Sequence, residues 1–145
     1  MKRKIIYSIG IVIFLICVIA YFKPLSFSDI VDNDNQIQMV LQDFSMRNGE
    51  ANIESEQYTT ITAEQKNSIL NVLDQFSYRR NIKTLFSDGS MSDLGDKMLS
   101  IYIYKNDLHS DSVMVSSSGK IAVNNKVYSM KNAENFIEQI IDIVE

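Results

Sequence analysis

The chain has 145 residues, of which 46% are hydrophobic, and a formal net charge of −4. This length is enough for one domain and too short for two once terminal segments are set aside. All 18 acidic residues follow residue 23, so most of the chain is acidic, which argues against nucleic-acid binding through clustered positive charge. The single cysteine, Cys17, excludes a disulfide within the chain.

Residues 5–22 form an uncharged apolar run directly behind Lys2, Arg3 and Lys4. As a helix this run would rise about 27 Å, close to the roughly 30 Å hydrocarbon core of a bilayer. The excess of basic residues before it predicts a cytoplasmic N-terminus. We therefore expect a single-pass anchor in the cell membrane and an extracytoplasmic C-terminal part. The residues taken to mark the anchor are Ile5, Ile13, Phe14, Leu15 and Phe22.

Two other interpretations of this run stay open. A signal peptide cleaved near Ala20 would give a secreted protein, although the run is longer than the usual apolar stretch of about 7–15 residues. A lipoprotein would be modified at Cys17, but the residue before it is the bulky Ile16.

The next part of the chain predicts a tether and then a strand. Residues 26–35 are polar and acidic and belong to a tether that can dock one short turn on the domain. From residue 36 onward, Ile37, Met39 and Leu41 alternate with glutamines, the pattern of a half-buried strand. The pair Asn48-Gly49 indicates a turn. We expect an anchor over residues 1–23, a tether over 24–35 and one extracytoplasmic domain over 36–145.

A helix is predicted to begin after Thr62. The Thr62 side chain and Gln65 can form a capping box, in which each side chain bonds the other residue's backbone N–H. Apolar residues then recur at helical spacing, at Ile69, Leu70, Leu73 and Phe76. The helix should end between residues 75 and 77.

Further strands are predicted in the second half of the chain. Residues 78–86 predict a strand that carries Arg79, Arg80 and Lys83, and residues 87–97 indicate a loop. The clearest strand covers residues 99–104, where β-branched and aromatic residues follow one another. Three short strands follow over residues 112–116, 121–123 and 126–129, separated by turns at 106–107, 118–119 and 124–125.

The chain closes with a predicted helix from about Asn132 to Val144, with Asn132 as its N-cap. Strands flanked by helices without strict alternation indicate an α+β fold. The prediction is an N-terminal transmembrane helix followed by one small domain, with an antiparallel sheet of about five strands and two packed helices in the order strand, helix, meander, helix.

Together these elements resemble a known type of protein. The basic start, apolar span, acidic tether, Thr62-capped helix, Ile-Tyr-Ile-Tyr strand at 101–104, turn at Gly119 and isoleucine-rich last helix are similar to small single-span, membrane-anchored outer-surface proteins of low-GC Gram-positive bacteria. Several of those belong to domain families of unknown function. The resemblance implies a location at the cell envelope and a fold, and it brings no functional residues.

Catalytic and metal-binding candidates are few. Ser117 and Lys120 have a Ser-x-x-Lys spacing, but Gly119 between them favours a hairpin turn over a catalytic helix. His109, the only histidine, lies in a predicted polar turn. The acidic loops at 32–35 and 88–96 do not match an EF-hand, so they leave at most weak calcium binding. We therefore predict no catalytic residue, no cofactor and no dedicated metal site.

Two surfaces are candidates for a partner. Tyr102 and Tyr104 point away from Ile101 and Ile103, so they face water or a partner if helices cover the isoleucine side. Arg79, Arg80 and Lys83 form a basic cluster in an acidic domain, where an anionic polymer or headgroup could bind.

The predicted function is a membrane-anchored, extracytoplasmic binding or accessory module that recognises a protein partner at the cell envelope. It is not expected to be an enzyme. Two alternatives stay open, namely an anchored hydrolase with an unrecognised site and a structural envelope protein that acts through its membrane helix.

Overall fold

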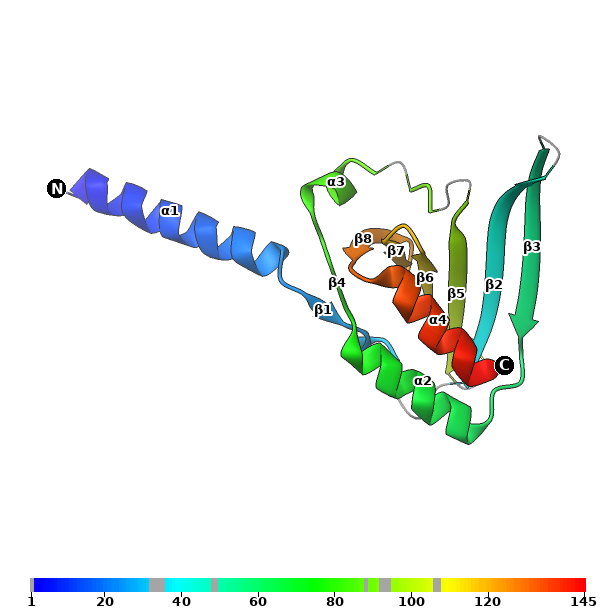
Figure 1. Ribbon diagram of the computed structural model, residues 1–145. Helices are drawn as coiled ribbons and strands as arrows, with labels where there is room; N and C mark the ends of the chain where they lie inside the picture. The colour runs from blue at the N-terminus through cyan, green and yellow to red at the C-terminus, as the bar shows by residue number, and fades with distance from the viewer. Residues whose placement is uncertain (1, 32–35, 48–49, 88, 92–94, 106–107) are drawn as a thin grey trace.

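The structure is a computed structural model that describes residues 2–31, 36–47, 50–87, 89–91, 95–105 and 108–145. The predicted turns at 48–49 and 106–107 lie outside these residues. Its elements follow in chain order (Figure 1): α1 Lys2–Tyr21, β1 Leu25–Ser26, the 3-10 turn η1 Phe27–Asp29, β2 Gln36–Arg47, β3 Glu50–Tyr58, α2 Ala63–Gln75, β4 Ser77–Arg79, α3 Ile82–Leu85, β5 Lys97–Lys105, β6 Leu108–Ser116, β7 Lys120–Val123, β8 Lys126–Met130 and α4 Ala133–Val144.

The described strands form one antiparallel sheet in the order β1-β4-β8-β7-β6-β5-β2-β3. The predicted fold is therefore wrong in its number of elements, because the described residues form eight strands and four helices. Two of the extra strands, β1 and β3, have little apolar pattern in their sequences. The meander of β5 to β8 does fall where the sequence predicts it.

The prediction of a transmembrane anchor is also corrected. Among the residues that the structure describes, no helix is long and apolar enough to cross a membrane. A crossing takes about 20 predominantly apolar residues, whereas α1 begins with the basic residues Lys2, Arg3 and Lys4 and ends at Tyr21. The membrane contact through residues 5–22 and the single-pass localisation are therefore not supported. Ile5, Ile13, Phe14 and Leu15 belong to α1, and Phe22 follows its end.

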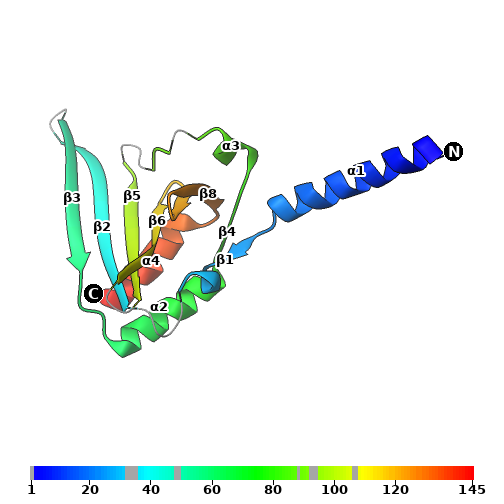
Figure 2. The same cartoon turned by 180° about the vertical axis from the view of Figure 1, so that it is seen from behind.

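One face of the sheet is covered by α2 and α4, which Figures 1 and 2 show on the same side. Side chains that point to this face are fully buried, among them Met39, Leu99 and Ile103. Both helices turn their apolar stripes to the sheet, and α2 buries Ile69 and Leu73 in this way. The core therefore lies between the sheet and these two helices.

Aromatic side chains connect the N-terminal segment to this core. Phe27 is fully buried and its ring stacks on Phe136 of α4, with ring centroids 5.7 Å apart. Phe76, which follows α2, meets Phe136 edge-on, with ring centroids 5.2 Å apart. Tyr78 of β4 lies 5.0 Å from Phe27. The segment predicted as a tether that docks one turn is thus fixed to the core by the buried side chains of Phe27 and Val31, while Ser28 and Asp29 of η1 stay exposed.

Local sequence signals explain the helix ends. Thr62 and Gln65 form the predicted capping box of α2, with the Thr62 Oγ1 accepting from the Gln65 N–H at 3.2 Å. At α4 the N-cap is Asn132, as predicted, but its left-handed φ of 55° leaves the side chain without a capping hydrogen bond. The prediction of a side-chain cap there is wrong.

The predicted strand over residues 78–86 is also wrong beyond its first two residues. The strand β4 ends at Arg79, and α3 begins at Ile82 after a second capping box. Asn81 and Thr84 exchange side-chain hydrogen bonds with each other's backbone N–H groups, at 2.9 and 3.0 Å. This local bonding favours a helical turn over an extended strand.

Phe27 gives a direct test of this packing. Phe27→Ala should lower the free energy of unfolding by about 3–5 kcal/mol, because it empties a fully buried aromatic site. Phe86→Ala is the matched control, since Phe86 is 85% exposed and its loss should change stability by less than about 0.5 kcal/mol. Urea unfolding followed by circular dichroism measures both. Equal effects of the two substitutions would contradict the buried position of Phe27.

Candidate partner-binding site

The strand β3 is the outermost strand on one side of the sheet (Figure 1). It pairs with β2 over nine residue positions, from Met39↔Tyr58 to Arg47↔Glu50. Its other edge pairs with no strand in the part of the chain that the structure describes. An edge strand presents a row of backbone N–H and C=O groups that can pair with another extended chain.

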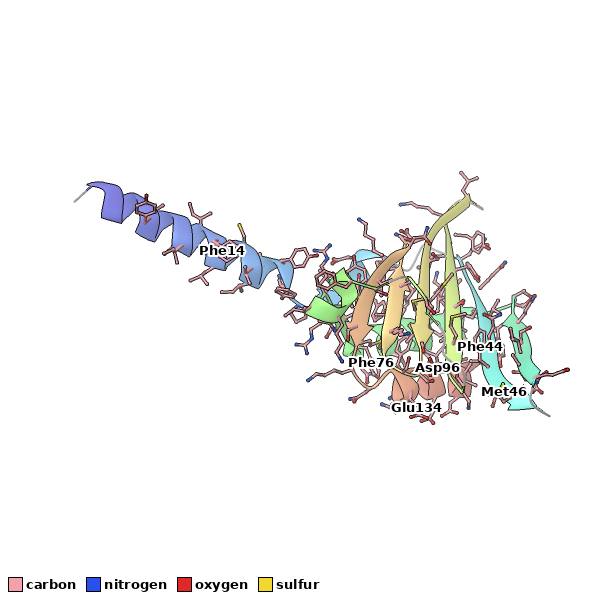
Figure 3. The ribbon with its side chains drawn as sticks, turned by 90° about the horizontal axis from the view of Figure 1, so that it is seen from above. Phe14, Phe44, Met46, Phe76, Asp96 and Glu134 are labelled. Atoms are coloured by element: carbon pink, nitrogen blue, oxygen red, sulfur yellow. The ribbon has the colours of Figure 1, made fainter. Side chains whose placement is uncertain are left out.

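The face of β2 and β3 away from α2 and α4 carries an apolar group, here called the hairpin cluster: the half-buried Phe44 and the exposed Met46 and Ile53. Phe44 lies directly opposite Ile53 in the pairing of β2 with β3. Met46 is 56% exposed and Ile53 is 57% exposed. Figure 3 shows Phe44 and Met46 of β2 at the side of the sheet away from α1. Exposed apolar side chains beside a free strand edge are typical of a protein-binding surface.

The opposite face of β3 is acidic. Glu56 lies opposite Leu41 of β2, and Glu54 lies opposite Asp43. A groove of about 240 Å³ separates this face from α4, and Leu41, Ile137 and Ile141 contribute its apolar lining. The acidic residues that line this acidic groove are Glu56, Glu134, Glu138, Asp142 and Glu145. Among the described residues that line it, Lys97 is the only basic one.

Hydrogen bonds within β3 hold two of its carboxylates in place. The Tyr58 hydroxyl donates to Glu56 Oε2 at 2.7 Å, and the Asn52 amide donates to Glu54 Oε1 at 3.1 Å. Burial, the bond to Glu56 and the charges of Glu56 and Glu145 raise the pKa of Tyr58 to about 12. Burial is the largest cause of this raised pKa, and the nearby carboxylates add to it.

The predicted tyrosine surface lies elsewhere on the same sheet. Tyr102 and Tyr104 of β5 are half-buried, and Ile101 and Ile103 are buried under the helices, as the alternation predicts. Tyr102 is opposite Gln38 of β2, six residues before Phe44. At about 3.4 Å per residue this separates the tyrosines from the hairpin cluster by roughly 20 Å along the strands. The two surfaces share a face but do not form one contiguous patch.

The predicted basic cluster lies at the other end of the sheet, around β4 and α3. The guanidinium carbon of Arg80 lies 4.7 Å from the Tyr21 ring centroid and 5.6 Å from that of Tyr128, so cation–π contacts hold it between α1 and β8. Lys83 lines a pocket of about 410 Å³ together with Lys120. Arg79 and Arg80 line a neighbouring pocket of about 510 Å³. The strands β5 to β8 separate this cluster from β2 and β3, and Tyr102 and Tyr104 lie on β5 among them.

The structure separates Ser117 from Lys120. Ser117 lines the acidic groove and accepts a hydrogen bond from the Lys97 N–H at 3.0 Å. Lys120 lines the pocket at the basic cluster. Between them the chain makes the predicted turn, with Gly119 at a φ of 93°. The two side chains therefore do not converge on one reacting atom, as a nucleophile and its base must.

The remaining predicted candidates are only partly described. The backbone of His109 lies in β6, opposite Tyr104, and not in a turn as predicted. The Asp-Asn-Asp-Asn run at 32–35 and the aspartates at 88 and 93 lie outside the described residues. Asp96 is described, and its Oδ2 accepts hydrogen bonds from the Ser116 and Ser118 hydroxyls at 2.7 and 2.9 Å. No group of three or more potential ligands for a metal ion is found among the described residues.

Sequence reasoning missed both the β3 edge and the acidic groove. The groove gathers residues from β2, β3 and α4, so no local run of sequence reveals it. Two partial signals exist. Glu54 and Glu56 flank Ser55 at strand spacing, and Glu134, Glu138 and Asp142 recur every four residues, on one side of a helix.

Comparison of the chain with protein-family models, with curated proteins and with solved structures finds no match. The resemblance to small outer-surface proteins therefore stays a prediction.

The Tyr58 phenol gives a test of the electrostatics. In the folded protein Tyr58 should titrate near pH 12, and Tyr58→Phe should remove that step from the ultraviolet titration curve. The burial of Tyr78 raises its pKa to about 12 as well, so the difference between the two curves isolates Tyr58. Glu56→Gln should move the titration of the Tyr58 phenol toward pH 10, whereas Asp74→Asn on α2 should leave it unchanged.

The sign of the accompanying stability change follows from the raised pKa. The folded chain holds the Tyr58 proton more tightly than the unfolded chain does. The stability gained from this shift is present below pH 10 and is lost as the pH rises toward 12. A Tyr58 step at its ordinary pKa of 10 would contradict the close approach of Glu56.

Proposed function

We propose that this protein is a non-enzymatic binding module that recognises a protein partner through the β2–β3 end of its sheet. The observation that carries the proposal is the long edge of β3, which no other described strand pairs with and which lies beside the exposed Met46 and Ile53 of the hairpin cluster. Strand addition at such an edge combines main-chain hydrogen bonds with side-chain contacts on both faces.

The shape of this end of the sheet supports binding to a protein. An extended chain of nine residues can pair along the whole of β3, whose length is nine residues. The hairpin cluster offers two exposed apolar side chains, Met46 and Ile53, as anchors. Large apolar side chains that become buried at the centre of an interface carry much of the binding energy.

The absence of enzymatic activity is part of this proposal. Within the described residues, the Ser-x-x-Lys pair points into two different pockets. The titratable groups of the acidic groove are carboxylates and one lysine, and they line an open surface groove beside the strand edge. Such an arrangement suits recognition of a charged partner.

Site-specific cross-linking tests the proposed surface. The full-length protein carries a photoreactive p-benzoylphenylalanine in place of Ile53, and it is irradiated in the cells that produce it. The control carries the same group in place of Asn125, an exposed residue in the β7–β8 turn. A protein joined to position 53 and not to position 125 is the expected result. Equal labelling at both positions, or none at 53, would overturn the proposal.

Binding of that purified partner is then measured. Met46→Ser combined with Ile53→Ser should weaken it about 10- to 100-fold, because two apolar anchors are lost. Leu108→Ser is the control, since Leu108 is 73% exposed and lies on β6 away from the hairpin cluster. Unchanged affinity of the double variant would remove the hairpin cluster from the interface.

A further inference from the structure

The two faces of β3 set different requirements for a chain that pairs with its free edge. Side chains on one face of an added strand would lie beside Ile53 and the hairpin cluster. Those on the other face would lie beside Glu54 and Glu56, next to the acidic groove. Since side chains alternate between the faces of a strand, these requirements apply to alternate residues of the added chain.

The acidic face is complementary to basic side chains at strand spacing. Glu54 and Glu56 are two residues apart and lie about 7 Å from each other along one face. An added strand presents its own residues on that face with the same repeat. Arginine or lysine at every second position would therefore meet these carboxylates in succession, and arginine could bind each one with two hydrogen bonds.

The groove extends this charge beyond the strand itself. Glu138 and Asp142 of α4 line it together with Glu56, and Lys97 alone opposes them among the described lining residues. Long basic side chains from an added strand can reach into the groove and lay their aliphatic stems on Leu41 and Ile141. The α4 helix also directs its C-terminal end, with its partial negative charge, toward this region.

The same charges argue against a second copy of this chain as the occupant. Two β3 strands that pair antiparallel over their full length would place Glu54 opposite Glu54. Glu56 would then lie opposite Asn52 of the other copy. Like charges directly opposite one another destabilise a strand pair.

We infer that the partner's segment is an extended chain with basic residues at every second position and apolar residues between them. It adds to the free edge of β3 with its basic side chains over the acidic groove and its apolar side chains on the hairpin cluster. This inference rests on the proposed function, and it adds the chemical class of the partner to it.

Synthetic nine-residue peptides test this inference. The first alternates arginine with valine, the second replaces each arginine with threonine, and the third has the composition of the first in a scrambled order. Each is titrated against the purified full-length protein at low and high salt. Hydrogen exchange then shows which backbone amides each peptide protects.

The alternating arginine peptide should bind at least about tenfold more tightly than either of the others at low salt, and it should slow exchange within β3. The preference should shrink at high salt, because salt screens the carboxylates. Equal binding of the scrambled peptide, or protection outside β2 and β3, would overturn the inference.

Variants locate the charges. Glu54→Gln combined with Glu56→Gln should weaken binding of the arginine peptide about tenfold, and glutamine can still accept the bonds from Asn52 and Tyr58. Asp29→Asn combined with Asp74→Asn removes two exposed acidic charges elsewhere and should leave the affinity unchanged. Equal losses in the two double variants would show a general charge effect and would overturn the inference.

Failure of the inference can be told apart from failure of the proposed function. If the threonine peptide protects β3 as well as the arginine peptide does, strand addition stands and the preference for basic residues is wrong. If no peptide protects β3 and cross-linking at position 53 yields no partner, the proposed binding surface itself is wrong.

Discussion

The packing of Phe136 against Phe27 and Phe76 is the contact on which the arrangement of this protein depends. Phe136 comes from α4, Phe76 follows α2, and Phe27 belongs to the segment that follows α1, so the contacts of one ring join three parts of the chain. Tyr78 continues the cluster to β4 and meets Tyr128 of β8 at 5.0 Å. The aromatic core is therefore concentrated near the β1–β4–β8 end of the sheet. At the other end, the strands extend past the helices and leave β3 with mostly exposed side chains.

The sequence predicts the parts of this fold whose residues have a clear local pattern. Alternation identifies β5, helical spacing identifies α4, and the Thr62 capping box marks the start of α2. The strand β3 has no such pattern, because neither of its faces is buried and Ile53 is the only aliphatic residue larger than alanine in it. It is extended because it pairs with β2, and this long-range contact cannot be found from its own composition. The same holds for β1, whose two residues pair with β4.

The candidate site shows the same limit. The alternation in β5 predicts correctly that Tyr102 and Tyr104 point away from the helix-covered face. The basic run from Arg79 to Lys83 is visible in the sequence, but the aromatic rings that contact Arg80 come from residues 21 and 128. The acidic groove joins β3 to α4 across about 80 positions of the chain. Only the tertiary fold places those carboxylates together. Taken alone, the spacing of the glutamates in β3, or of the acidic residues in α4, is equally typical of a solvated surface.

The two ends of the sheet also differ in what they offer another chain. At one end the edge strand is β1, which has two residues and follows Pro24, so it provides almost no backbone for pairing. At the other end β3 offers nine residues. Repeated head-to-tail addition of copies needs a long free edge at both ends of the sheet, and among the strands that the structure describes only β3 provides one. A chain that pairs with β3 would therefore become the last strand of the sheet without starting a row of copies. The glutamates of β3 also disfavour a second copy of this protein in that position.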